Sequence, residues 1–157
     1  EVHSDLDSFL KELVDSLQQE LPVMVMERLR EPVYDIDLLA WKGQPKRVVA
    51  RRRVNSAVPN EGHMIVDNRE LYDLGEQLIR TFQLSWLYDC DVMYDKEGNP
   101  CVLEVNPRQS GSVSVSIAAG VPLLDDLVSL AIGEALPEIS LPVGQRVLPY
   151  KALKVIS

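Results

Sequence analysis

Two carboxylates, an amide and a guanidinium are spaced so that they could bind a metal ion beside a phosphate group. The segment Leu103 to Arg108 reads Leu-Glu-Val-Asn-Pro-Arg, and it follows Asp91 closely enough in the sequence for the two to lie on paired strands of one hairpin. Side chains alternate across a strand, so Glu104 and Asn106 project to the same face. An antiparallel partner strand can bring Asp91 onto that face as well. Three oxygen-bearing side chains should therefore converge, with the cation Arg108 just beyond the strand end.

This donor set predicts a hard divalent cation beside an anion site. Mg²⁺ prefers one or two carboxylates together with substrate phosphates, and Mn²⁺ accepts the same oxygen ligands. Arg108 would complete an anion site next to the metal, which indicates handling of a nucleotide polyphosphate. Acidic residues that flank a tight turn can also be solvated hairpin ends. Asp89 and Asp95 are interpreted in that way, although Asp89 shares the strand parity of Asp91.

The composition excludes several classes of partner. The chain has 157 residues, 46% hydrophobic and 25% charged, enough for one domain or for a piece of a larger one. Its net charge of -8 disfavours nucleic acid and anionic membranes as partners, and no apolar run approaches the ~20 residues of a membrane span. Cys90 and Cys101 are expected to be reduced and to lie on the face opposite Asp91 and Glu104, which indicates a cytoplasmic protein.

Helices and antiparallel hairpins are expected to position the candidate residues. Hydrophobic periodicity and turn residues predict the elements. In chain order these are a helix over 4–19 capped by Ser4, a strand over 23–27, a hairpin of strands 34–41 and 46–54, a loop over 55–69, a helix over 70–82, the hairpin of strands 87–95 and 101–106, a helix over 122–136, and an edge strand over 146–156. This order predicts an α+β fold, an antiparallel sheet flanked by helices.

Several segments of the chain follow the pattern of a known superfamily. They are 25–29, 34–40, 88–98, 103–111, 118–122 and 130–133. Through them the chain resembles the ATP-grasp superfamily, and within it the carbamoyl-phosphate-synthase-like and biotin-carboxylase-like members. Segment 25–29 is similar to the hinge between the two lobes that grip ATP, and Glu-x-Asn-Pro-Arg is the most specific part of the likeness.

The resemblance implies a role for each matching residue of the second hairpin. Asp91, Glu104 and Asn106 would be Mg²⁺ ligands that bridge the ATP phosphates. Arg108 would be the catalytic residue that binds the transferring phosphoryl group or the acyl-phosphate.

The resemblance also implies residues for the nucleotide. Met26, Glu27 and Leu29 would hold the adenine edge and the ribose, and Arg51 or Arg53 would point into the phosphate cleft. An ordinary strand-end carboxylate remains an alternative for Glu27, and a solvated edge strand remains one for the arginines.

Part of the superfamily pattern is not recognised in this sequence. ATP-grasp enzymes carry an N-terminal substrate-binding domain and a small lobe with a Gly-rich flap and a phosphate-binding Lys. We therefore expect residues 1–33 to be the end of the small lobe and its hinge, and residues 34–157 to be the C-terminal lobe of one larger domain. The missing N-terminal part of the ATP-grasp enzyme would be the partner of this chain. Whether the protein also forms a homo-oligomer is left open by the sequence.

Three functions compete at this point. The leading one is an ATP- and Mg²⁺-dependent ligase of the carboxylate–amine or carbamoyl-phosphate type, which acts on a small carboxylate or a bicarbonate-like substrate through an acyl-phosphate. The alternative is a non-catalytic nucleotide-binding or structural module that retains the fold. A third is a metal-binding structural domain without a nucleotide.

Overall fold

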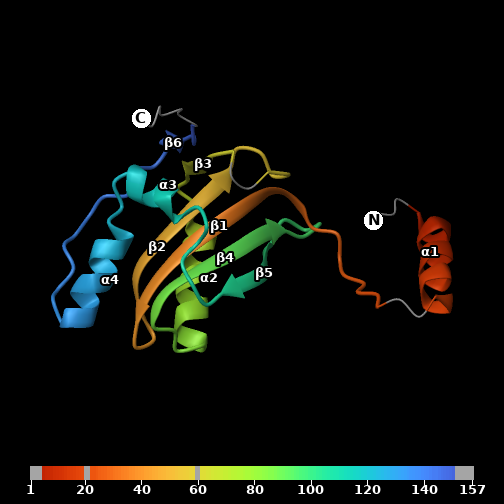
Figure 1. Ribbon diagram of the computed structural model, residues 1–157, viewed down its shortest axis with the longest axis horizontal. Helices are drawn as coiled ribbons and strands as arrows, with labels where there is room; N and C mark the ends of the chain where they lie inside the picture. The colour runs from red at the N-terminus through yellow and green to blue at the C-terminus, as the bar shows by residue number, and fades with distance from the viewer. Residues whose placement is uncertain (1–4, 20–21, 59–60, 151–157) are drawn as a thin grey trace, which may run out of the picture.

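The computed structural model describes residues 5–19, 22–58 and 61–150. Within these ranges the chain forms one antiparallel sheet of six strands in the order β5-β4-β1-β2-β3-β6, with helices on both of its faces (Figure 1). The predicted α+β class is confirmed. In chain order the elements are α1 (Leu6–Gln18), β1 (Arg30–Trp41), β2 (Gln44–Arg53), β3 (His63–Ile65), α2 (Arg69–Thr81), β4 (Trp86–Tyr94), β5 (Pro100–Asn106), α3 (Val113–Ala118), α4 (Leu123–Ile132) and β6 (Arg146–Val147).

One face of the sheet is apolar and is covered by α2. Alternate residues of β1, from Ile36 to Ala40, pack together with Leu71 and Ile79 of α2 and are fully buried. α2 begins after Asn68, whose side chain accepts a hydrogen bond from the Leu71 backbone N–H at 3.3 Å. Because this layer buries the apolar residues of the central strands, the residues between them point to the opposite face.

Gly75 is the point at which α2 comes closest to the sheet. A Cβ atom at this position would lie 2.8 Å from Leu38 Cδ2 and 2.8 Å from Val48 Cγ1. We expect Gly75→Ala to lower the free energy of unfolding by about 1–3 kcal/mol, because overpacking outweighs the higher helix propensity of alanine. Urea denaturation would measure the change. The matched control is Gly111→Ala, where the added Cβ meets no atom within 4 Å, and equal stability of the two variants would contradict this packing.

The opposite face of the sheet is apolar at one end and polar at the other. At the apolar end Leu39, Val49 and Leu87 pack against Val121 and Leu123. The segment that contains α3 and α4 therefore covers this end of the face (Figure 1). The polar end carries the candidate site, and Ser112 and Ser116 of the α3 segment reach its edge.

The predicted ends of the sheet differ from the structure. Residues 22–29 form no strand and are mostly exposed, because an apolar run alone does not supply a partner strand. The predicted loop over 55–69 contains β3, which pairs with β2. The predicted edge strand over 146–156 is a strand only at Arg146–Val147, and residues 151–156 lie outside the described ranges.

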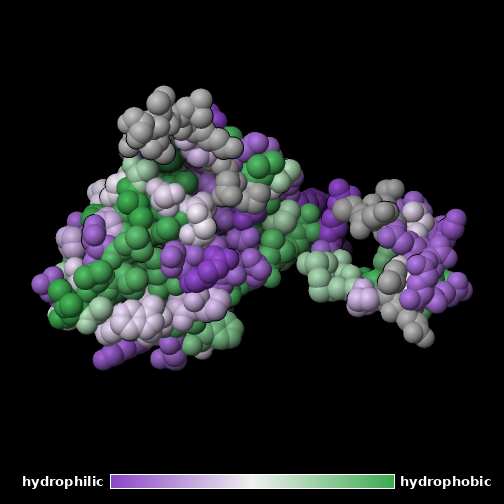
Figure 2. All heavy atoms as spheres, viewed as in Figure 1, coloured by the Kyte–Doolittle hydropathy of each residue, from purple (hydrophilic) through white to green (hydrophobic). Residues whose placement is uncertain are grey.

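α1 stands apart from the sheet, as Figures 1 and 2 show. Its N-cap is Asp5, which accepts a hydrogen bond from the Ser8 backbone N–H at 2.8 Å, whereas the predicted cap Ser4 lies outside the described residues. None of its residues is buried, and its apolar stripe is exposed, namely Leu6, Leu10, Val14 and Leu17. In the described part of the chain no helix has the length and apolarity needed to cross a membrane.

A β-bulge in the second hairpin changes the side on which one cysteine lies. The pairing of β4 with β5 skips Leu103, so Cys101 lies opposite Met93. Cys101 is therefore on the face of Asp91, and only Cys90 lies on the opposite, α2-covered face. The prediction that both cysteines share that face is wrong, although both thiols are free as expected.

The two thiols should react at very different rates. Burial, together with the nearby carboxylates, raises the pKa of Cys90 to about 12, and the thiolate is the reactive form. Cys101 is only partly buried. We expect a disulfide reagent such as DTNB to modify one thiol per folded chain and the second only after unfolding. The variant Cys101→Ser should then lack the fast phase, and a fast phase of two thiols in the unmodified protein would contradict the placement of Cys90.

Candidate metal and phosphate site

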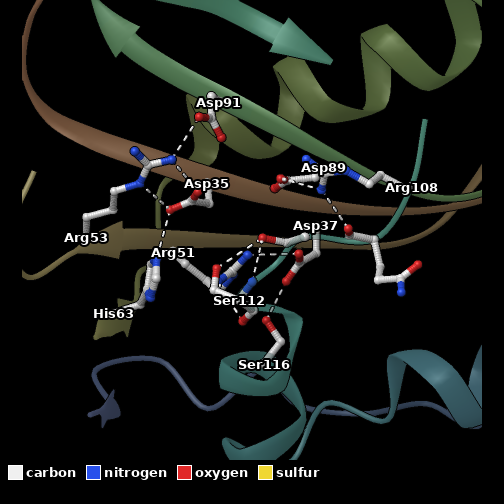
Figure 3. Close-up of polar contacts among 12 residues, drawn as sticks. Asp35, Asp37, Arg51, Arg53, His63, Asp89, Asp91, Arg108, Ser112 and Ser116 are labelled. Atoms are coloured by element: carbon white, nitrogen blue, oxygen red, sulfur yellow. Dashed lines mark hydrogen bonds and ion pairs between the residues drawn. The ribbon is translucent and has the colours of Figure 1, made fainter. Parts of the chain in front are cut away.

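Oxygen-bearing side chains from three adjacent strands form the centre of the polar face. Asp91 of β4 lies directly between Asp35 of β1 and Glu104 of β5 in the strand register. The next row repeats the arrangement with Asp89 at its centre. Four of these side chains come together in Figure 3. We call the whole set the acidic patch, and its members are Asp35, Asp37, Asp89, Asp91, Glu104 and Asn106.

Arg53 and His63 contact one corner of the acidic patch. The Arg53 guanidinium donates to both oxygens of Asp35, at 3.0 and 2.7 Å, and to Asp91 Oδ2 at 2.8 Å. His63 Nε2 lies 2.9 Å from Asp35 Oδ2. Burial by itself raises the pKa of Asp35, but the hydrogen bonds from His63 and Arg53 outweigh it and hold that pKa well below its usual range. Asp35 is therefore an ionised carboxylate whose two oxygens are both engaged.

Arg51 is enclosed beneath the patch. Its guanidinium donates to Asp37 Oδ1 at 2.9 Å and to the hydroxyl and carbonyl oxygens of Ser112, and neither ionic side chain of the pair has exposed surface. Ser116 donates to the second oxygen of Asp37 at 2.5 Å. Of the two arginines predicted for the phosphate cleft, Arg51 could reach a ligand only if these contacts opened. Arg53, at the edge of the acidic patch, is the one that remains nearer to solvent.

Asp89 is buried but has little compensation for its charge. Its nearest cation is Arg108, with Nη1 at 3.8 Å from Oδ2, and its Oδ1 has no hydrogen-bond partner among the described residues. Desolvation, followed by repulsion from Asp35 and Asp91, raises the pKa of Asp89 to about 6. The interpretation of Asp89 as a solvated hairpin end is therefore wrong, whereas Asp95 is only partly buried and accepts hydrogen bonds from the backbone and side chain of Asn99 in the turn.

The β5 side of the patch is open to solvent. Glu104 is exposed, and its Oε1 accepts a hydrogen bond from Asn106 Nδ2 at 2.8 Å. Glu104 Oε2 and the Asn106 side-chain oxygen remain as acceptors at this edge. Arg108 is also exposed, and it donates to the Gln109 carbonyl oxygen at 2.9 Å. The predicted site residues Asp91, Glu104 and Asn106 are thus adjacent on one face, with Arg108 at its end beside Asp89.

The residues of the patch suit a divalent cation. The donors are carboxylate and amide oxygens, the ligands that Mg²⁺ and Mn²⁺ prefer. Oxygens of Asp35, Asp89 and Asp91 lie within 4.8 Å of one another, close to the ~4.2 Å that separates opposite ligands of one Mg²⁺. Burial raises the pKa of Asp91, and repulsion from Asp35 adds to this effect. Added positive charge would therefore stabilise the ionised patch.

A cleft beside the second hairpin contains part of the predicted nucleotide set. It has a volume of about 1110 Å³, and Glu27 and Leu29 line it together with Met93 of β4. Met26 is exposed and does not line this cleft. Met93 points to the same sheet face as Asp91, two residues away along β4. The cleft and the acidic patch therefore follow one another along this strand.

The sequence did not predict the β1 half of the patch. Asp35 and Asp37 alternate with apolar residues and therefore share one face of β1, but nothing in the sequence shows that this face adjoins Asp91. Ser112 and Ser116 were not singled out either, because the contacts of Ser112 with Arg51 and of Ser116 with Asp37 form only after the α3 segment packs against the sheet.

The structure is similar to the crystal structure of an L-amino acid ligase from Bacillus licheniformis, with a TM-score of 0.55 and 19% sequence identity. The similarity covers 78% of this chain but only 35% of that one, so the chain spans about a third of the ligase. No curated protein matches the chain.

Residues 19–154 match the family described as "ATP-grasp in the biosynthetic pathway with Ter operon", and the chain belongs to this family. The predicted membership of the ATP-grasp superfamily is confirmed. The narrower likeness to carbamoyl-phosphate synthases and biotin carboxylases stays a prediction.

Proposed function

We propose that the protein acts as an ATP- and Mg²⁺-dependent ligase, and that this chain carries the metal and phosphate half of its site. The observation that carries the proposal is the pairing of Asp91 directly opposite Glu104, with Asn106 beside them, on the open part of the sheet face. The similar crystal structure is of an L-amino acid ligase, which supports a ligase of the carboxylate–amine type over the carbamoyl-phosphate type.

The charges of the patch support a divalent cation. Asp35 and Asp37 are each matched by a guanidinium, from Arg53 and Arg51. Asp91 shares Arg53 with Asp35, and Glu104 makes no ion pair among the residues that the structure describes. When Asp89 is included, the carboxylates of this partly buried site outnumber the guanidinium groups. One Mg²⁺ or Mn²⁺ would offset the excess negative charge.

The position of the cleft supports ATP as the nucleotide. With Glu27, Leu29 and Met93 around the base and ribose, the phosphates would extend along β4 towards the patch. Two residues of a strand span about 7 Å, so Asp91 is within reach of a polyphosphate whose nucleoside lies beside Met93. Arg108 lies beyond the metal ligands, where it would bind the transferred phosphoryl group.

The chemistry that these groups support is phosphoryl transfer to a carboxylate. A carboxylate oxygen attacks the γ-phosphorus and ADP leaves; an amine then attacks the acyl carbon, and phosphate and a proton leave. Such transfer needs positioning and charge neutralisation more than a protein nucleophile. Bound Mg²⁺ would shield the charge of the polyphosphate. Arg108 would hold the phosphoryl oxygens, and Arg53 would keep the Asp35 and Asp91 carboxylates ionised and in place.

A further part of the enzyme is proposed as well. We infer that a small lobe with a phosphate-binding lysine and a substrate-binding domain complete the site, and that residues 1–33 belong with that lobe and residues 34–157 with the C-terminal lobe. The acceptor would be bound largely by those parts.

The test of this function is the trapping of the acyl-phosphate. The intact protein, incubated with ATP, Mg²⁺ and a panel of amino acids and other small carboxylates, should release ADP, and hydroxylamine should convert the activated carboxylate to a hydroxamate. Release of AMP and pyrophosphate would contradict the mechanism. Binding of ATP without any product would identify the non-catalytic nucleotide-binding module instead.

A further inference from the structure

Asp89 differs from the other buried carboxylates of the patch. Both oxygens of Asp35 accept hydrogen bonds from Arg53 or lie beside His63. Both oxygens of Asp37 accept hydrogen bonds, one from Arg51 and one from Ser116. Asp89 is 5% exposed, yet its Oδ1 has no partner among the described residues. Two other buried polar atoms also lack a partner, Arg51 Nε and His63 Nδ1. Of these three atoms, Asp89 Oδ1 is the one that belongs to a carboxylate.

The Asp89 carboxylate lies close to the other carboxylates of the metal site. Asp89 is two residues from Asp91 on the same face of β4, and their oxygens lie within 4.8 Å. Across the hairpin it pairs directly with Asn106, as Asp91 does with Glu104. Figure 3 shows the carboxylates of Asp89 and Asp91 along the same strand, with Arg108 beyond Asp89.

Leaving a buried carboxylate unpaired is costly for the fold. A charge without an adequate partner destabilises the folded state, and an unsatisfied buried acceptor adds a desolvation penalty. Arg108 compensates weakly, because its nearest nitrogen is 3.8 Å away and the side chain is 57% exposed. Such a penalty is typical of a functional position, where local stability is given up for the site.

We propose that Asp89 is a further ligand of the divalent cation, which it shares with Asp91. This proposal rests on the metal site of the proposed function and extends its ligand set beyond Asp91, Glu104 and Asn106. Asp89 and Asp91 of β4 would then bind the cation from the side of the sheet nearer β1. Glu104 and Asn106 of β5 would bind it from the solvent-exposed side.

The test compares metal affinity with stability in the same variant. Asp89→Asn keeps the shape and removes the charge. Titration with Mn²⁺ in the presence of a non-hydrolysable ATP analogue, followed by EPR of the free ion, should show binding weakened by about tenfold or more. Without metal, the same variant should unfold at a higher temperature than the unmodified protein, because the buried repulsion is removed. Asp73→Asn, which removes one exposed charge from α2, is the control and should change neither.

The outcomes separate this proposal from the proposed function. If Asp91→Asn and Glu104→Gln lose Mn²⁺ while Asp89→Asn binds it like the control, the role of Asp89 is overturned and the metal site stands. If none of the three variants differs from the control, both are overturned. A lower unfolding temperature of metal-free Asp89→Asn would assign Asp89 a structural role and would also overturn the proposal.

Discussion

Glu104→Gln is expected to lower the kcat of the intact protein by about 10³-fold, with little change in stability. Glu104 faces Asp91 across the hairpin and supplies the carboxylate on the open side of the metal site. Losing its charge weakens the stabilisation of the transferring phosphoryl group, and losses of single electrostatic groups have effects of about this size. Because the side chain is exposed, the free energy of unfolding should change by less than about 0.5 kcal/mol. Rates of ADP release and urea denaturation would measure the two quantities.

The control for this prediction is another exposed glutamate. Glu134 follows α4, away from the acidic patch, and Glu134→Gln should keep the full rate. Turnover of Glu104→Gln within a few-fold of the unmodified protein would show that this carboxylate does not hold the metal.

Arg51→Ala is expected to be the most destabilising single change in the sheet, by about 3–5 kcal/mol. Arg51 and Asp37 form an ion pair without any exposed surface. Removal of the guanidinium leaves Asp37 as a buried charge, and among the described residues the Ser116 hydroxyl is then its one remaining side-chain donor. Ser112 also loses its contacts with Arg51, so the segment that leads into α3 should loosen. Denaturation by urea at neutral pH would show a lower midpoint.

Two further variants make this prediction specific. Arg52 is the next residue of β2, but it points to the other face and is exposed, so Arg52→Ala should change the stability by less than about 0.5 kcal/mol. The double variant Arg51→Met with Asp37→Leu replaces the pair with apolar groups and should recover most of the loss. If Arg51→Ala and Arg52→Ala were equally stable, the buried pair would have no role in holding the fold.

The second hairpin could be predicted from the sequence because its information is local. Period-two alternation and the turn residues after Tyr94 define both strands, and the common face of Glu104 and Asn106 follows from them. The bulge at Leu103 is not visible in that pattern, so the face of Cys101 was predicted wrongly. A single skipped residue reverses the face of the residues on one side of it relative to those on the other, and Cys101 and Glu104 lie on opposite sides of Leu103.

The other half of the site depends on contacts between distant segments. β1 and β4 are neighbours in the sheet although they are separated in the chain by β2, β3 and α2. Only that adjacency brings Asp35 to Asp91 and explains why Asp89 is buried and not solvated. The same reason applies to Arg51, for which the family resemblance implied a place in the phosphate cleft. Its burial is decided by α3 and the segment before it, which pack over the end of the sheet.

The most direct measurement is the affinity of the intact protein for ATP with and without Mg²⁺, by titration calorimetry. We expect ATP to bind much more tightly when Mg²⁺ is present, and we expect Asp91→Asn and Glu104→Gln to remove this difference while binding without metal is retained. ATP affinity that is the same with and without Mg²⁺, or a Mg²⁺ effect that persists in both variants, would contradict a metal and phosphate site on the hairpin of β4 and β5.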